Sequence, residues 1–432
     1  MIAQSQIQTS DRANFNHLVG DIAWFGLALA ATTRFLSVYA IRLGASAVDL
    51  GWISALPALI VVITSSLGAW WTRRFKTSER SLFLPGLGMR FLFLLPALAP
   101  FLPLRWQPLW LILAVSIPAF PQGIASVSFF VMFRDAIHPS SMIRLLSHRQ
   151  LALNLCLGGA ALVFGVWLEK APFPLNYQVM FLLAFAFSLI SLIHCISVQT
   201  PPLVVTQSET PLVRKRGTNP WRSSGFQRVA VVSVVIQIAF TILVPVLPLY
   251  LVDRMGADEG FMAVFALIEL AAGAVASVLA PRIRERIGTR PMIAFMIAGT
   301  ALNAIIIAFA PNLYVALFAA IFSGACWTAG AGVGLFQFFV ENTPADEMPA
   351  YSTAYSQING LAVFAGPMLG SLLASSGMSL VLVILFGAVL RLIAAPLVDT
   401  SLVFGQPARQ SARAAASRAL TKLRAASHIA IF

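Results

Sequence analysis

Long apolar runs recur along almost the whole chain, and they leave few folds open to it. Twelve runs of helical length cover residues 17–42, 47–71, 82–104, 108–133, 150–168, 177–198, 227–252, 259–281, 291–310, 312–339, 351–375 and 378–398. A membrane-spanning helix needs about 20 mainly apolar residues. A transmembrane β-strand needs only about ten, with alternating polarity. The runs therefore predict an all-α integral membrane protein with twelve transmembrane helices.

The composition excludes the common classes of soluble protein. Hydrophobic residues make up 59% of the 432 residues and charged residues only 10%, whereas soluble domains carry about 25% charged residues. The sequence shows no nucleotide-binding glycine loop, no His-Glu-x-x-His helix and no Cys/His cluster with metal-ligand spacing. Three scattered cysteines, Cys156, Cys195 and Cys326, predict no disulfide framework. We therefore expect no enzyme activity, no cofactor and no metal.

The basic residues are distributed unevenly between alternate loops. If the N-terminus is inside, 22 of the 29 Lys and Arg residues fall in inner loops and tails, and four fall in outer loops. Cytoplasmic loops of membrane proteins are enriched in Lys and Arg. We therefore predict a multi-pass protein of the cell (cytoplasmic) membrane with both termini in the cytoplasm. The net charge of +13 then indicates contact with an anionic inner leaflet and no nucleic acid.

A polar stretch divides the chain into two halves. The predicted order is a cytoplasmic N-terminal tail, a six-helix half, a cytoplasmic linker, a second six-helix half and a basic cytoplasmic tail, at residues 1–16, 17–198, 199–226, 227–398 and 399–432. The halves repeat features in the same order. Leu43-Gly44-Ala45 precedes the second span, and Met255-Gly256-Ala257 precedes the eighth, 212 residues later. Such parallel repeats are typical of transporters, and they predict two pseudo-symmetric halves.

The inner loop after the eighth span carries a recognisable pattern. It contains Glu285 and Arg286 side by side, then Gly288 and Arg290. With this loop, the chain resembles the major facilitator superfamily of secondary transporters over about residues 16–399. The resemblance implies alternating access, a small-molecule substrate and a gating role for this loop. In the matching loop of the first half, Arg73 and Arg74 follow Gly68 without an acidic residue.

We expect the protein to be a monomer.

Ionisable residues inside apolar spans are costly and are functional candidates by default. Glu269 lies near the middle of the eighth span. Burial favours the protonated form of a carboxyl group, so Glu269 could exchange protons near neutral pH. The alternative is a neutral, hydrogen-bonded side chain that holds a helix interface. Asp21, in the first turns of the first span, is a second proton-coupling candidate, or only an interfacial helix charge.

Arginine stays charged, so each arginine inside a span needs an explanation. Arg34 in the first span requires an anionic partner, a water-filled cavity or an anionic substrate. Arg90 and Arg391 each lie about eight residues from the inner end of a span. For these two we expect the side chains to extend to the inner headgroups.

The family resemblance places the first, fourth, seventh and tenth spans around a central cavity. The polar or aromatic candidates for its lining are Arg34, Gln122, Gln237, Thr241, Trp327 and Gln337. Proline and glycine predict helix bends at Pro118, Pro121, Pro245, Pro248, Gly366 and Pro367. The last two belong to Gly366-Pro367-Met368-Leu369-Gly370, which resembles the Gly-Pro-x-x-Gly element that antiporter members carry in the fifth span. The predicted cavity is largely apolar.

Three functions fit this pattern. The first is a secondary active transporter that exports a hydrophobic or amphipathic compound in a proton-coupled cycle. The second is an uptake carrier for an organic anion that binds at Arg34. The third, from another class, is a transporter-like membrane sensor or interaction protein that does not transport, which the incomplete first gating loop favours.

Overall fold

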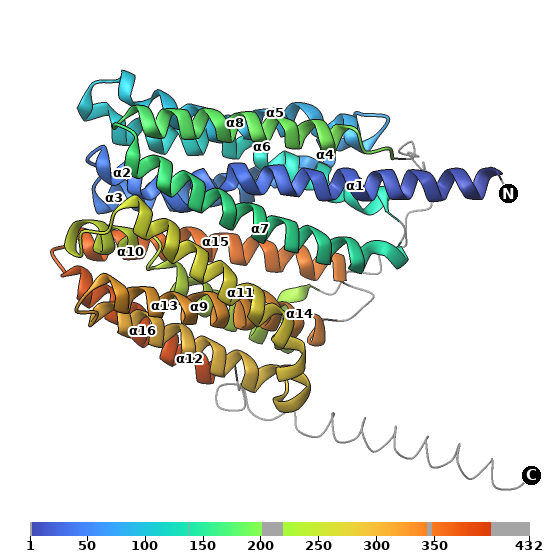
Figure 1. The fold of residues 1–432 in the computed structure, drawn as a ribbon. Coiled ribbons are helices and arrows are strands. Elements are labelled where there is room, and N and C mark those ends of the chain that lie inside the picture. The colour runs from blue at the N-terminus through green and yellow to red at the C-terminus, as the bar shows by residue number, and fades with distance from the viewer. Residues whose placement is uncertain (1, 138, 201–218, 344–347, 399–432) are drawn as a thin grey trace, which may run out of the picture.

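The computed structural model describes residues 2–137, 139–200, 219–343 and 348–398. In this part of the chain, helices are joined by short turns and loops, and no strand occurs (Figure 1). Twelve helical spans in it are long and apolar enough to cross a membrane, so the predicted fold class is confirmed. Most of the predicted linker, residues 201–218, and the predicted basic tail, residues 399–432, lie outside the described residues.

Six spans form the N-terminal half. The first consists of α1 (Ile2–Ala30), a π-helical segment (Ala31–Phe35) and α2 (Leu36–Arg42). The next five are α3 (Ala47–Ser65) with the short α4 (Gly68–Thr72), α5 (Ser78–Leu94) with a 3-10 extension (Leu95–Phe101), α6 (Gln107–Ala136), α7 (Pro139–Lys170) and α8 (Leu175–Ile196). The predicted N-terminal tail is thus helical from Ile2, and Figure 1 shows α1 projecting beyond the bundle.

Six further spans form the C-terminal half. The seventh span consists of α9 (Ser224–Thr241), α10 (Val246–Leu249) and a π-helical segment (Tyr250–Arg254). After α11 (Glu259–Ile287) and α12 (Thr289–Ala308), the tenth span consists of α13 (Leu313–Trp327), a π-helical segment (Thr328–Leu335) and α14 (Phe336–Glu341). The last two spans are α15 (Met348–Ser375) and α16 (Leu380–Leu397).

The two halves meet along two pairs of helices, α3 with α15 and α7 with α11. Small residues let these helices approach closely, as is common in membranes. A Cβ atom added at Gly165 would lie 2.4 Å from that of Ala263, and one at Gly360 would lie 2.0 Å from a Val62 methyl group. The two halves therefore pack with their backbones close together, both between α3 and α15 and between α7 and α11.

The repeated Gly-Ala turns are the clearest local sign of pseudo-symmetry. Gly44 and Gly256 both adopt positive φ, at 80° and 69°, a conformation that glycine adopts without steric cost. The amide of Ala45 donates to the carbonyl of Ala40, and the amide of Ala257 donates to that of Leu251, both at 2.9 Å. The second turn contains one more residue because a π-helical segment precedes it.

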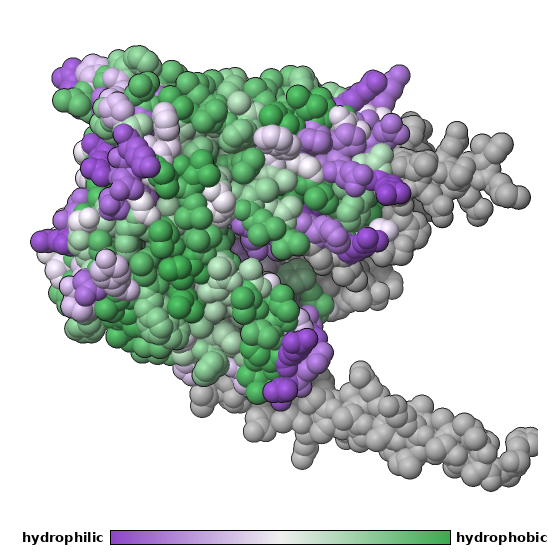
Figure 2. Space-filling view, viewed as in Figure 1, coloured by the Kyte–Doolittle hydropathy of each residue, from purple (hydrophilic) through white to green (hydrophobic). Residues whose placement is uncertain are grey.

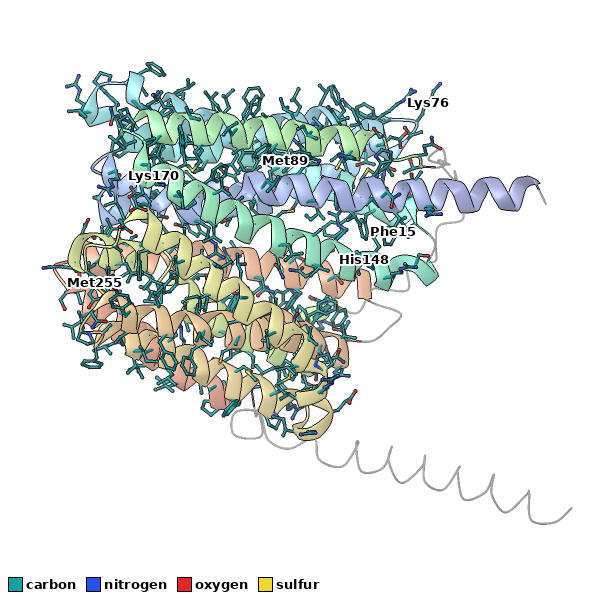
Figure 3. All side chains as sticks on the ribbon, in the orientation of Figure 1. Phe15, Lys76, Met89, His148, Lys170 and Met255 are labelled. Atoms are coloured by element: carbon teal, nitrogen blue, oxygen red, sulfur yellow. The ribbon has the colours of Figure 1, made fainter. Side chains whose placement is uncertain are left out.

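The bundle has two distinguishable ends. Figure 2 shows hydrophobic residues over its middle and hydrophilic residues at both ends, as a protein embedded in a bilayer requires. We call the end that carries the exposed Arg73, Arg74 and Lys76 the basic end. Figure 3 places Lys76 and His148 at this end, and Lys170 and Met255 at the opposite end.

The expectation that Arg90 and Arg391 extend to the headgroups is wrong. Arg90 is 4% exposed and Arg391 is 2% exposed. Arg90 donates to the carbonyls of Gly86 and Ser188 and to the Ser191 hydroxyl. Helix carbonyls and a hydroxyl within reach satisfy the guanidinium inside the bundle, so the side chain does not need the headgroups.

Candidate transport site

The site centres on an ion pair between the halves. Arg34 Nη1 donates to Glu269 Oε2 at 2.6 Å, and Ser323 Oγ donates to Glu269 Oε1 at 2.6 Å. The two charged side chains each remain 22% exposed. Water and protons can therefore reach the pair. Because most of each side chain is nevertheless buried, loss of either partner would be costly. Of the predicted alternatives for Arg34, the structure shows an anionic partner inside the protein.

Local backbone features bring these three side chains together. Arg34 lies in the π-helical segment Ala31–Phe35, and such segments insert one residue into a helix and occur often at functional sites. On the other side, a Cβ atom at Gly324 would lie 1.8 Å from the carbonyl oxygen of Glu269. Only glycine lets α13 approach α11 this closely, and the approach places Ser323 beside the carboxylate.

The ion pair separates two cavities. One, of about 590 Å³, is lined by residues that lie toward the basic end, including Gln150, Asn154 and Ser277. The other, of about 190 Å³, is lined by residues toward the opposite end, including Leu247 and Met262. The residues that line both are Thr33, Arg34, Phe240, Glu269 and Ser323. A substrate that moved from one cavity to the other would have to pass the ion pair.

A break in the seventh span borders both cavities. α9 ends at Thr241 and α10 begins at Val246, with Pro245 between them. The last turn of α9 places Phe240 on Trp327, with ring centroids 3.6 Å apart and planes 19° apart. The helix is thus interrupted at Pro245, one of the positions where a bend is predicted, and the break lies next to the start of the π-helical segment of the tenth span.

The predicted Gly-Pro-x-x-Gly element packs against this break. A Cβ atom at Gly366 would lie 1.9 Å from the Thr241 hydroxyl, and one at Gly370 would lie 1.9 Å from the Ile242 carbonyl. α15 continues as one helix through Gly366 and Pro367, and α6 continues through Pro118 and Pro121. The element is thus a close-packing surface, and a bend at these four residues stays a prediction, as does one at Pro248.

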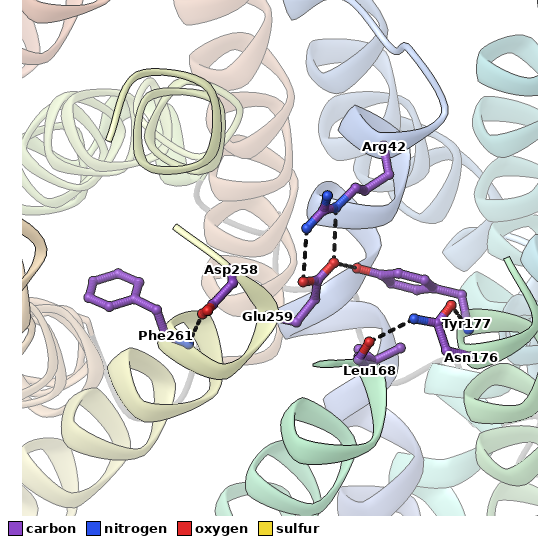
Figure 4. A network of polar contacts seen from close by, with 7 residues as sticks. All are labelled: Arg42, Leu168, Asn176, Tyr177, Asp258, Glu259 and Phe261. Carbon is purple, nitrogen blue, oxygen red and sulfur yellow. Dashed lines mark hydrogen bonds and ion pairs between the residues drawn. The ribbon is translucent and has the colours of Figure 1, made fainter. Parts of the chain in front are cut away.

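A second link between the halves lies at the opposite end (Figure 4). Arg42 donates from Nε and Nη2 to the two carboxylate oxygens of Glu259, each at 3.0 Å, and Tyr177 Oη donates to Glu259 Oε1 at 2.9 Å. Tyr39 stacks on Tyr177 with centroids 4.5 Å apart. We call Arg42, Glu259 and Tyr177 the clamp. It ties the first and sixth spans to the eighth.

Asp21 belongs to a separate cluster within the N-terminal half. It is 4% exposed, and it accepts from Arg149 at 3.1 Å and from the Ser191 hydroxyl at 2.7 Å. Together with Gln122 and Arg90 it lines a third cavity of about 280 Å³. Of the two alternatives for Asp21, the interfacial helix charge is contradicted, because the side chain is buried in an ion pair. Its role in proton coupling stays a prediction.

The remaining predicted site residues lie in different places. Trp327 lines the larger of the two cavities at the ion pair. Gln237, Thr241 and Gln337 line neither of them. Thr241 donates to the Gln237 carbonyl, and Gln337 donates to Glu341 near the basic end. Their predicted position in the central cavity is not supported.

The predicted gating loops are exposed at the basic end. Arg73, Arg74, Glu285 and Arg286 are all exposed. The guanidinium of Arg74 lies 3.7 Å from the Trp70 ring centroid, and that of Arg290 lies 5.8 Å from the Phe338 ring centroid. Gly288 ends α11 with φ of 88°. Their role in gating stays a prediction.

Sequence reasoning missed several residues of the site. The clamp residues Arg42 and Glu259 fell at span boundaries, where charges are common, and Tyr177 carries no charge. Ser323 is one of many serines in apolar runs. A search for helix-boundary residues of opposite charge in the two halves could have found Arg42 and Glu259. Among the described residues, no group of three His, Cys, Asp or Glu is placed to hold a metal ion.

The comparisons with known proteins decide the family. The model of the Major Facilitator Superfamily matches residues 22–367 and 229–428, which together exceed half of the chain. The chain belongs to the Major Facilitator Superfamily. Family and fold together point to a non-enzymatic transporter.

Solved structures of superfamily transporters share the fold. A D-xylose–proton symporter matches with a TM-score of 0.69 and 17% identity, over 89% of this chain and 96% of that one. A bacterial homologue of the iron transporter ferroportin in an inward-facing state matches with 0.69 and 13%, over 90% and 98%. The nucleoside transporter NupG matches with 0.67 and 11%, over 90% and 100%. At these identities the likeness shows the superfamily fold alone.

Proposed function

We propose that this superfamily member is a proton-coupled secondary transporter that moves an amphipathic small molecule by alternating access. The observation that carries the proposal is the Arg34–Glu269 pair, which joins the two halves between two cavities. A proton on Glu269 removes its negative charge and weakens the tie to Arg34. Since the pair links the halves, protonation then changes how easily they separate. Glu269 is the coupling acid in this cycle, and Arg34 is its charge partner.

The clamp and the basic loops supply the two gates. The clamp holds the halves together at the opposite end, about 15 Å from Glu269 by the helical rise over ten residues. The basic loops at the other end stand exposed. We assign the basic end to the cytoplasm of the cell membrane, following the charge asymmetry of the loops. The conformation described then has its closed gate on the outer side.

Two directions of transport remain candidates, each with an observation in its favour. Export of a hydrophobic or amphipathic compound is favoured by the apolar walls of the cavity at the opposite end, such as Leu243, Val244 and Leu247. Uptake of an organic anion is favoured by Arg34, whose Nε atom is buried without a partner among the described residues. An anion on Arg34 would replace Glu269 and favour its protonation, so anion and proton would travel together.

Proteoliposomes loaded with a pH-sensitive dye test the coupling. A panel of hydrophobic, amphipathic and anionic compounds is added to vesicles with wild-type protein, the Glu269→Gln variant or no protein. We expect compound-dependent proton movement with wild type only. Exchange of protons against the compound would assign export, and movement in the same direction would assign uptake. Proton movement in Glu269→Gln at the wild-type rate would contradict the coupling role. Compound flux without proton movement would contradict proton coupling itself.

The same experiment addresses the non-transporting class. If the purified protein binds panel compounds but moves none of them, the sensor function takes the place of the carrier. The Glu269→Gln variant changes little besides the charge, because glutamine keeps the size of the side chain and can still accept a hydrogen bond from Ser323.

A further inference from the structure

The cavity at the opposite end of the ion pair contains a second guanidinium. Arg391, from α16, lines this cavity together with Arg34 and Glu269. Arg391 is 2% exposed, and it donates to the carbonyls of Ala239, Phe240 and Thr300 at 3.0, 3.2 and 2.7 Å. These three bonds fix its position, and Phe240 lies beneath it with the ring centroid 4.9 Å away. Within the described part of the chain no carboxylate contacts it.

The charges in this cavity do not balance. Arg34 and Arg391 are cations that stay protonated, and Glu269 is the one acidic residue among the lining residues. Glu269 is already bound to Arg34. Helix carbonyls stabilise Arg391 through their dipoles but cancel none of its charge. Transfer of an unpaired charge from water into such an environment is costly, so the cavity is prepared for one additional negative charge.

Further polar atoms in the cavity also await a partner. Asn303 is 3% exposed and lines the cavity, and its Oδ1 atom has no hydrogen-bond partner among the described residues; as an acceptor it calls for a donor and does not itself select an anion. Arg34 Nε, which is a donor, is likewise buried without a hydrogen-bond partner among the described residues. A buried polar group without a partner carries a desolvation penalty. These two groups come from the first and ninth spans, and both residues line the cavity that Arg391 lines.

We propose that this cavity is the binding subsite for the head group of an amphipathic organic monoanion, with Arg391 as its main ligand. A carboxylate fits because three of the five guanidinium N–H groups of Arg391 donate to helix carbonyls, which leaves two N–H groups to donate to an anion. The volume of about 190 Å³ suits a head group with a short apolar body. The apolar walls then contact the body of the substrate. The inference rests on the proposed transport path, and it names the substrate class.

Equilibrium binding to the purified full-length protein tests the subsite without requiring transport. The probes are benzoate, its neutral analogue benzamide, the cationic benzylamine and the dianion terephthalate, each titrated in a thermal-shift assay. A ligand that binds the folded form raises its melting temperature, and the free energy of stabilisation grows with the logarithm of ligand concentration over Kd, so a titration yields the affinity. We expect benzoate to stabilise the protein and to bind at least about tenfold more tightly than the other three compounds.

Three substitutions locate the site. Arg391→Gln removes the guanidinium, and Asn303→Asp adds a negative charge to the same cavity while the guanidinium of Arg391 remains. Both should weaken benzoate binding about tenfold or more. Asn154→Asp is the matched control, since it adds the same charge to the cavity on the basic side of the ion pair and should leave benzoate binding within about twofold of wild type. If Arg391→Gln does not fold, Asn303→Asp still tests the proposal.

Several outcomes would overturn the subsite. The first is that benzoate does not stabilise the protein, or stabilises it no more than benzamide or benzylamine does. The second is that Asn303→Asp binds benzoate as tightly as wild type, or that Asn154→Asp loses as much benzoate affinity as Asn303→Asp. None of these touches the coupling role of Glu269, because the protein could carry a neutral or cationic compound. Conversely, benzoate binding at Arg391 with no flux in proteoliposomes would remove the transport proposal and keep the subsite.

Discussion

Arg42 and Glu259 form a two-pronged ion pair in which both carboxylate oxygens accept a hydrogen bond of 3.0 Å. This geometry is the strongest that a guanidinium and a carboxylate make. Arg42 ends the first span and Glu259 begins the eighth. Arg34 and Glu269, on the same two spans, form a second pair nearer the middle. The first and eighth spans are thus joined twice, and each pair offers a test of the gating cycle.

Loss of the clamp should open the opposite end. In Arg42→Gln, Glu259 keeps only its bond from Tyr177, and the closed state loses a charge-assisted contact. In a background in which Cys156, Cys195 and Cys326 are replaced by serine, we expect a cysteine at Leu247, in the cavity, to react about three- to tenfold faster with a water-soluble maleimide. Arg105→Gln is the control at the same end. Equal rates in the clamp variant and the control would exclude a gating role.

The contact between α11 and α13 should tolerate no side chain at Gly324. A Cβ atom there would lie 1.8 Å from the Glu269 carbonyl oxygen, and overpacking of this kind costs about 1–3 kcal/mol. We expect Gly324→Ala to lower the melting temperature and to disturb the ion pair. Gly159→Ala, a glycine with no atom within 4 Å of the added Cβ, is the matched control and should not lower it. Equal melting temperatures for both variants would refute the close contact.

The two proton-coupling candidates can be separated by substitution. Asp21 pairs with Arg149 inside the N-terminal half, whereas Glu269 pairs across the halves. Asp21→Asn should lower thermal stability, because it leaves the partly buried Arg149 without its acid, at roughly 1–3 kcal/mol for a charged hydrogen bond. It should leave the ratio of protons to substrate unchanged. Glu269→Gln should abolish proton movement. The reverse result in proteoliposomes would transfer the coupling role to Asp21.

The assigned orientation has a direct test in intact cells. Lys76 and Lys170 are both exposed and lie at the two ends of the bundle (Figure 3). We expect a cysteine at Lys170 to react with a membrane-impermeant maleimide in intact cells, and a cysteine at Lys76 to react only after lysis. Labelling of the Lys76 variant in intact cells would place the basic end outside.

The sequence predicted the spans and the residues of the central pair, but not the pairing itself. Glu269 and Arg34 stand out because charges are rare in apolar runs. That they touch, 235 residues apart, depends on how each helix is rotated about its axis, which packing sets. For Arg391, the sequence did not determine even the direction of the side chain. Its side chain is long enough to reach the headgroups, and only the position of the carbonyls of Ala239 and Thr300 decides that it points inward.

The clamp was unpredictable for a different reason. Glu259 is the first residue of its helix, where an acidic side chain is favoured by the helix alone, so its sequence position carried no sign of a partner. By contrast, the twin turns at Gly44 and Gly256 were visible as a repeat, because positive φ restricts the choice of residue. A local backbone conformation restricts the residue type and can be read from a single sequence, whereas a contact between distant helices cannot.

The position of Glu259 and Glu269 on one unbroken helix makes α11 a lever. The backbones of α11 and α13 touch where Gly324 meets Glu269, so a tilt of α11 that releases Glu259 from Arg42 would pivot at this contact and turn the Glu269 side chain relative to Arg34. In the proposed cycle, the clamp and the coupling acid are then mechanically geared through one helix. A carrier geared in this way resists opening both gates at once, which is the leak that would dissipate the ion gradient.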